Sequence, residues 1–183
     1  MGLDEVFDYF RSYDKSSFHV VACQGNEPTE RDVADFERAI GFTLPEDFRA
    51  FTTSPLGGLY IEVRENLWPA AEPFAVGPFW SFLRGLQVFG IANGIPDWLD
   101  IRVQFKKFVD DGHPSVVPFL KIEGDADWYC FDRSGAIVRW NHEQDSFEPV
   151  ELGFSELLLH ELRELEERKD RKLRDKDSVP SRS

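Results

Sequence analysis

The sequence predicts an α+β fold, a single domain in which helices flank an antiparallel sheet and a long C-terminal helix ends in a charged, frayed stretch. Helical patterns stand at both ends of the chain, and strand-like runs joined by tight turns lie between them. A chain of 183 residues is long enough for one domain with a sizeable core. No linker divides the chain, so we predict a domain over residues 1–175 and a disordered tail over residues 176–183.

The most informative stretch runs from Glu30 to Gly58. Thr29 stands at an N-cap position and Asp32 follows three residues later, an incomplete form of the capping-box pattern. Gly41 is placed to end this helix in a left-handed conformation. Pro45 suits the first position of a second, short helix, where its missing N–H costs nothing. The stretch therefore predicts two consecutive helices leading into a strand.

The remaining pattern completes the predicted order of elements. In sequence these are helix 3–11, strand 18–23, helix 30–40, a short helix from Pro45, strand 59–63, strand 87–92, helix 96–108, strands 116–123, 127–132, 137–141 and 147–150, and helix 154–173. Ile101 and Val103 leave a strand open as the alternative for 96–108. Residues 65–84 are the least regular part, because three prolines interrupt any helix there.

Several segments together resemble a known family. They are Phe36–Glu37, Ile40–Gly41, Leu44–Pro45, Gly57–Gly58, the hairpin of Trp128–Asp132 with Ser134–Val138, and Phe154 at the start of the last helix. In this order they resemble the SUKH superfamily, which holds the Smi/Knr-type regulators of fungal cell-wall assembly and many bacterial toxin-immunity proteins. The resemblance covers most of residues 3–165. It implies a SUKH-like domain and a non-catalytic protein-binding module.

The charge of the chain is large and uneven. The formal net charge is −13, and residues 1–162 carry 13 Lys+Arg against 28 Asp+Glu, a balance of −15. An acidic surface of this kind repels nucleic acid and attracts basic proteins. We therefore predict a basic protein partner and no direct nucleic-acid contact. The alternative interpretation is that the acidity serves only solubility.

The search for catalytic chemistry gives little. None of the four histidines stands at a metal-ligand spacing, and no nucleophile elbow or phosphate-binding loop is present, so no cofactor is predicted. A small hydrolase using His142 with Asp132 or Asp145 is the weakest of the functional alternatives. Cys23 and Cys130 are predicted to be buried free thiols.

The segment from Asn66 to Phe82 is the strongest candidate for a binding surface. It holds five aromatic residues among three prolines, and Glu62, Glu65 and Glu72 lie close in sequence. Such a segment either covers the core or forms an interaction surface rich in Trp and Phe anchors. A second candidate is the turn with Asp125 and Asp127, whose carboxylates serve the turn or form an acidic rim. The predicted partner-binding residues are Glu62, Glu65, Trp68, Asp125 and Asp127.

The resemblance and the charge together predict a bacterial immunity protein that neutralises a cognate toxin, with a nuclease as one candidate. A regulatory scaffold that binds several partners is the alternative. The N-terminus has acidic residues where a secretory signal would be positive, and no apolar run approaches the length of a membrane helix. We therefore expect a cytoplasmic protein without membrane contact, as a monomer or weak dimer.

Overall fold

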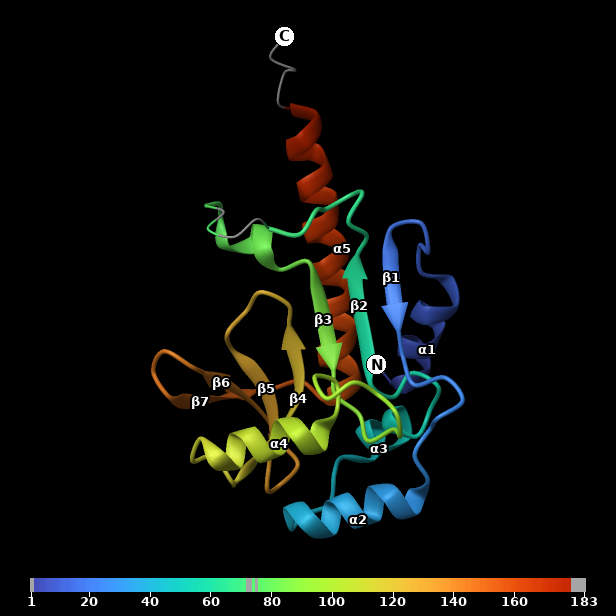
Figure 1. Ribbon diagram of the computed structural model, residues 1–183, viewed down its shortest axis with the longest axis vertical. Helices are drawn as coiled ribbons and strands as arrows, with labels where there is room; N and C mark the ends of the chain where they lie inside the picture. The colour runs from blue at the N-terminus through green and yellow to red at the C-terminus, as the bar shows by residue number, and fades with distance from the viewer. Residues whose placement is uncertain (1, 72–73, 75, 179–183) are drawn as a thin grey trace.

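The computed structural model describes residues 2–71, 74 and 76–178, and within them a single sheet carries the helices on its two faces (Figure 1). The elements are α1 (Leu3–Ser12), β1 (Phe18–Val21), α2 (Glu30–Ile40), α3 (Glu46–Thr52), β2 (Leu59–Val63), the short 3-10 helix η1 (Phe79–Phe82), β3 (Gly85–Val88), α4 (Ile101–Asp110), β4 (Val116–Ile122), β5 (Trp128–Asp132), β6 (Ile137–Asn141), β7 (Ser146–Val150) and α5 (Phe154–Ser178). This is the α+β fold that the sequence predicts.

The seven strands follow one another in chain order, and every neighbouring pair is antiparallel. One row of paired residues crosses the whole sheet on the same face: Val21, Tyr60, Gln87, Lys121, Trp128, Trp140 and Phe147. Because side chains alternate between the faces of a strand, the neighbouring positions point to the other face. A register shift between Pro118 and Leu120 marks a bulge in β4.

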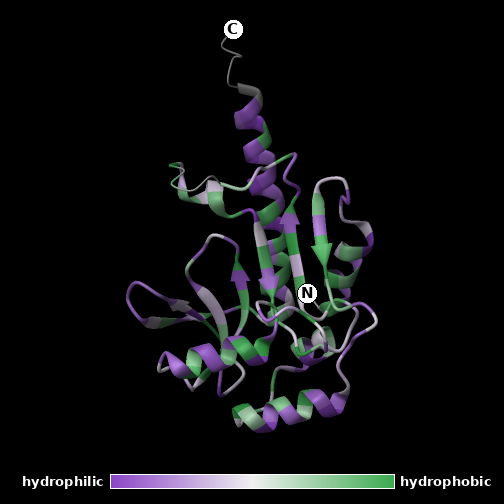
Figure 2. Cartoon of the chain, in the orientation of Figure 1, coloured by the Kyte–Doolittle hydropathy of each residue, from purple (hydrophilic) through white to green (hydrophobic). Residues whose placement is uncertain are grey.

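One face of the sheet packs on α5, which runs behind β2 and β3 in Figure 1. Leu59 and Ile61 on β2 share a fully buried core with Leu158 and Leu162 on α5. Figure 2 shows the contrast along α5, whose beginning is apolar and whose outer turns are mostly hydrophilic. The burial of this apolar surface is the main favourable term in the stability of the domain.

The other face is covered over β4–β6 by α4. The ring of Phe108 on α4 lies 5.4 Å from that of Trp128 and 5.3 Å from that of Trp140. Over β1 and β2 this face stays partly exposed: the side chain of His19 is half exposed, and Trp98 from the loop before α4 stacks edge-on against Tyr60.

The capping box that begins α2 is complete. Thr29 Oγ1 accepts the backbone N–H of Asp32, and the Asp32 carboxylate accepts the backbone N–H of Thr29. Gly41 ends the helix at φ 83°, as predicted. We expect Thr29→Ala to lower the free energy of unfolding by about 1 kcal/mol in urea titrations. The exposed Thr43 is the matched control, and an equal loss in Thr43→Ala would contradict the capping role.

Several element boundaries differ from the predictions; β1, for example, ends at Val21 instead of Cys23. Strand β3 ends at Val88 instead of Ala92, because Gly90 leaves the sheet, donates its N–H to the Leu99 carbonyl and accepts the N–H of Ile101. Helix α4 begins only at Ile101, where the Asp100 side chain accepts the Arg102 N–H; the strand alternative for this segment is wrong. Pro45 lies one residue before α3, at its N-cap position.

The last helix is longer than predicted. It ends at Ser178 instead of Leu173, so residues 176–178 of the predicted tail are helical, and residues 179–183 lie outside the described part. Three cationic side chains of its charged stretch lie over aromatic rings: Lys169 over Phe18, Arg171 over Trp80 and Lys172 over Trp68. The aliphatic stems of such side chains cover apolar surface, so the charged turns of α5 pack against these aromatic rings.

Candidate functional site

Three of the predicted binding residues lie at the end of β2 or just after it. Glu62 accepts a hydrogen bond from Tyr60 Oη at 2.8 Å and forms an ion pair with Arg84 at 2.5 Å, with its side chain 15 % exposed. Glu65 is 73 % exposed and lies 3.9 Å from the same guanidinium. Trp68 is 2 % exposed, and its indole N–H donates to the Ser81 carbonyl. Of these three, only Glu65 presents most of its side chain to solvent.

The other two predicted residues flank the turn between β4 and β5. Arg139 on β6 forms ion pairs with both Asp125 and Asp127, each at 3.1 Å. Asp127 also accepts the backbone N–H of His142 and lies 3.2 Å from the Nδ1 atom of that ring. The side chains of Asp125 and Asp127 are 9 % and 18 % exposed. The pair therefore fastens the turn to β6, and one arginine neutralises much of its charge.

The two groups of predicted residues lie at the same end of the sheet. The backbone of Gly124, before Asp125, approaches the Phe82 carbonyl so closely that a Cβ on Gly124 would lie 2.4 Å from that oxygen. Two residues later, Arg84 donates to the Trp68 carbonyl and to Glu62. The segment from Phe82 to Arg84 thus connects the end of β2 with the β4–β5 turn.

The aromatic segment 66–82 divides between the two interpretations that the sequence left open. Trp68 is buried and Trp80 is partly buried, with ring centroids 6.4 Å apart, so this part covers the core. Phe74, Val76 and Phe79 are exposed. Glu72, which the sequence places near this surface, lies outside the described residues.

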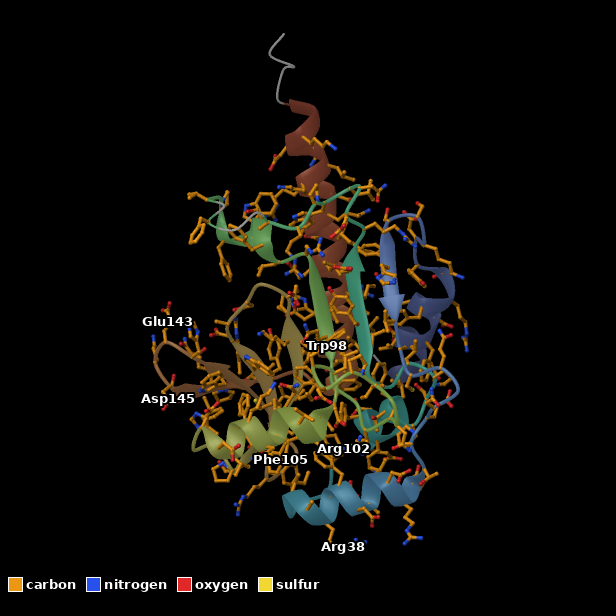
Figure 3. All side chains as sticks on the ribbon, viewed as in Figure 1. Arg38, Trp98, Arg102, Phe105, Glu143 and Asp145 are labelled. Carbon is orange, nitrogen blue, oxygen red and sulfur yellow. The ribbon has the colours of Figure 1, made fainter. Side chains whose placement is uncertain are left out.

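The hairpin of β6 and β7 forms a concentrated acidic surface. Residues 140–162 contain six Asp+Glu and no Lys or Arg. Four of the six, Glu143, Asp145, Glu148 and Glu151, are exposed on this hairpin and directly after it. Figure 3 shows Glu143 and Asp145 at the tip of the hairpin. Because β7 is the last strand of the sheet, the hairpin stands at an open edge.

Aromatic rings lie directly beside these carboxylates. Asp145 has a left-handed backbone at φ 47°, accepts a hydrogen bond from the Trp140 indole N–H, and lies 3.1 Å from His113 Nε2. The ring of His113 in turn contacts those of Trp140 and Phe147, both at 5.5 Å. Trp140 and Phe147 are partly exposed. An apolar centre with a polar, charged rim is the composition of protein-binding surfaces.

Two buried polar groups link the sheet to other elements. The Tyr129 hydroxyl donates to Glu161 on α5 at 2.9 Å, and burial, with the Glu161 charge as a second cause, raises the pKa of Tyr129. The Cys23 thiol donates to the Ser54 carbonyl at 3.4 Å. Cys23 and Cys130 are buried and form no disulfide, as predicted, and burial raises the pKa of Cys130. A group held protonated in this way is a structural donor or a core residue.

The histidine and carboxylates considered for a hydrolase do not come together. The ring of His142 faces Asp127, whereas Asp145 faces His113 and Asp132 accepts the N–H groups of Ser134 and Ala136 in the β5–β6 turn. In the described part of the chain, no group of three or more His, Cys, Asp or Glu residues is arranged to hold a metal ion. No helix there is long and apolar enough to span a bilayer.

Fold and sequence now define the class of this chain. It is an α+β domain with a seven-stranded antiparallel sheet and a long terminal helix, and the model of the SMI1 / KNR4 family (SUKH-1) matches residues 27–160. The chain belongs to this family, within the SUKH superfamily, whose members bind partner proteins and include immunity proteins and Smi1/Knr4 regulators. A search of curated proteins finds no match.

The sequence did not lead us to predict the acidic hairpin, because His142 and Asp145 were considered only for a hydrolase site. The available signal was the 23-residue run from Trp140 to Leu162 without one basic residue. Total charge conceals such a run, because Arg133 and Arg139 precede it and a mixed-charge helix end follows.

Proposed function

We propose that this protein is a non-catalytic immunity protein that binds a toxin domain through the acidic β6–β7 hairpin. The observation that carries the proposal is the unbroken acidic run over residues 140–162, four of whose carboxylates are exposed beside Trp140 and Phe147. Membership of the SUKH-1 family supports a protein-binding role. A toxin that cleaves nucleic acid needs a basic surface for the phosphate backbone. The carboxylates of the hairpin would occupy that surface in place of phosphates.

The predicted residues take secondary roles in this proposal. Asp127 lies beside the hairpin and orients His142, so we place it at the rim of the contact. Glu65 is exposed and belongs to the same end of the sheet as Asp125. Glu62, which contacts Tyr60 and Arg84, and Trp68, which donates to the Ser81 carbonyl, have structural roles in this proposal. We propose a cytoplasmic location, because nuclease toxins act on nucleic acid inside the cell.

The test uses the toxin domain that the proposal expects to be encoded beside the gene of this chain. We expect co-expression to restore growth, and the association rate to fall by about tenfold or more between low salt and about 0.5 M salt. Stopped-flow or surface plasmon resonance measures the rate. An association rate that does not change with salt would exclude the electrostatic mechanism, and a toxin that stays fully active in the complex would exclude immunity.

A regulatory scaffold is the second candidate. One observation favours it: the chain carries a second partly exposed aromatic surface, over segment 66–82, beside the basic end of α5. A scaffold would copurify with several proteins and would lack a toxin gene beside its own.

A further inference from the structure

A pocket of about 590 Å³ lies between segment 66–82 and the last turns of α5. Its wall is mainly apolar and includes Trp68, Val76, Pro78 and Trp80, while Lys172, Asp175 and Lys176 line its helix side. The volume falls in the range of small-ligand pockets, about 300–1,000 Å³, and holds one or two large side chains.

The charge around this pocket is opposite to that of the rest of the chain. Residues 168–178 carry six basic and three acidic residues, whereas residues 1–162 carry a balance of −15. Arg171 lies 5.0 Å from the centroid of the Trp80 ring, and the Lys172 ammonium lies 5.8 Å from that of Trp68. Cations held against aromatic faces keep their charged heads near the apolar wall. A ligand here therefore meets apolar surface and positive charge together.

The mouth of the pocket is exposed. Val76 on its wall is fully exposed, and Phe79, between the wall residues Pro78 and Trp80, is 60 % exposed. Large apolar side chains left in water beside a pocket mark interaction sites.

We propose that this pocket docks an acidic segment of a partner protein. The segment inserts a large apolar side chain between the ring of Trp80 and the Val76–Pro78 wall, and its neighbouring carboxylates lie against Lys172 and Lys176. Charge complementarity selects this occupant, because two of the three charged residues on the helix side are lysines, and a basic segment would meet them as like charges. An anionic membrane fits less well, since the site is concave and the chain as a whole carries −13. This inference does not rest on the function proposed for the hairpin.

The experiment selects random twelve-residue peptides on the full-length protein and measures the strongest one by fluorescence polarisation. We expect the selected peptides to combine Phe, Trp or Leu with adjacent Asp or Glu. The variant Lys172→Glu/Lys176→Glu should weaken binding by about tenfold or more. Arg163→Glu/Arg174→Glu is the matched control, because it makes the same charge change on exposed positions of α5 outside the pocket wall, and it should change binding by less than about threefold.

Several results would overturn the proposal. The selection could enrich no peptides, or it could enrich basic ones. The two double variants could weaken peptide binding equally. Finally, a Trp80→Ala protein that melts at the wild-type temperature could still bind the peptide as tightly as the wild type. Sedimentation with phosphatidylglycerol vesicles in place of peptide binding would assign the site to a membrane. If the protein self-associates, and only Lys172→Glu/Lys176→Glu abolishes this self-association, the pocket would bind a second copy of the chain.

Discussion

Replacing Phe48 with alanine is expected to lower the free energy of unfolding by about 3–5 kcal/mol. Phe48 on α3 is fully buried, and its ring contacts Phe131 on β5 at 5.0 Å and Phe154 on α5 at 5.1 Å, with Phe119 at 5.9 Å. These edge-on contacts add to the burial of the ring itself. Since Phe154 begins α5, the cavity left by alanine would loosen the joint between α3, the sheet and the terminal helix.

The melting temperature should fall by about 6–20 °C, from a dependence of about 2–4 °C per kcal/mol in a chain of this size. Phe79→Ala is the control, because that ring is 60 % exposed, and we expect its effect on stability to stay below about 1 kcal/mol. Urea titration with circular dichroism measures both variants. A Phe48→Ala protein as stable as Phe79→Ala would show that the aromatic cluster does not hold the layers together.

The sequence predicts those parts of the fold whose causes are local. Thr29 and Asp32 cap each other within one turn, and Gly41 reaches its left-handed conformation without help from distant residues. Strands β2 and β6 have the predicted bounds, because turn residues and alternation lie within them. Long-range causes account for the errors. Gly90 leaves the sheet where its backbone approaches Gly58, and a Cβ on Gly90 would lie 2.3 Å from the Gly58 nitrogen.

The end of α5 shows the same limit. Its last turns have no apolar stripe, so the sequence predicts fraying from Glu166 onward. Arg168 is nevertheless 6 % exposed, and the rings that contact Arg171 and Lys172 belong to Trp80 and Trp68, which lie 91 and 104 residues earlier in the chain. Periodicity within a helix cannot reveal a partner at that separation.

In the candidate site, too, local features could be predicted from the sequence and long-range contacts could not. Counting charges over a window would have found the acidic run, since this is a property of sequence alone. The aromatic neighbours of that run could not be found in this way. The antiparallel pairing of β6 and β7 places Trp140 opposite Phe147. His113 lies after α4, yet its ring contacts that of Phe147 and its Nε2 atom lies close to Asp145. The ion pairs of Arg139 with Asp125 and Asp127 likewise depend on how the β4–β5 turn lies against β6.

Reversing three charges on the hairpin should weaken binding of the toxin domain by about a hundredfold or more, mostly through slower association. The variant is Glu143→Lys/Glu148→Lys/Glu151→Lys, which changes the net charge by six, from −13 to −7. All three side chains are exposed, so the fold should tolerate the changes. Asp145 is left in place because it holds Trp140 and His113.

A control variant separates local charge from net charge. Asp4→Lys/Glu5→Lys/Asp8→Lys makes the same total change at exposed positions of α1, which lies beside β1 at the opposite edge of the sheet from the hairpin. Long-range attraction falls off beyond about 10 Å at 0.1 M salt, so the control should lose less than about tenfold in association rate. The salt dependence should also become shallower in the hairpin variant and stay steep in the control. Equal losses in the two variants would mean that the partner senses only the total charge, and the hairpin would then not be the binding site.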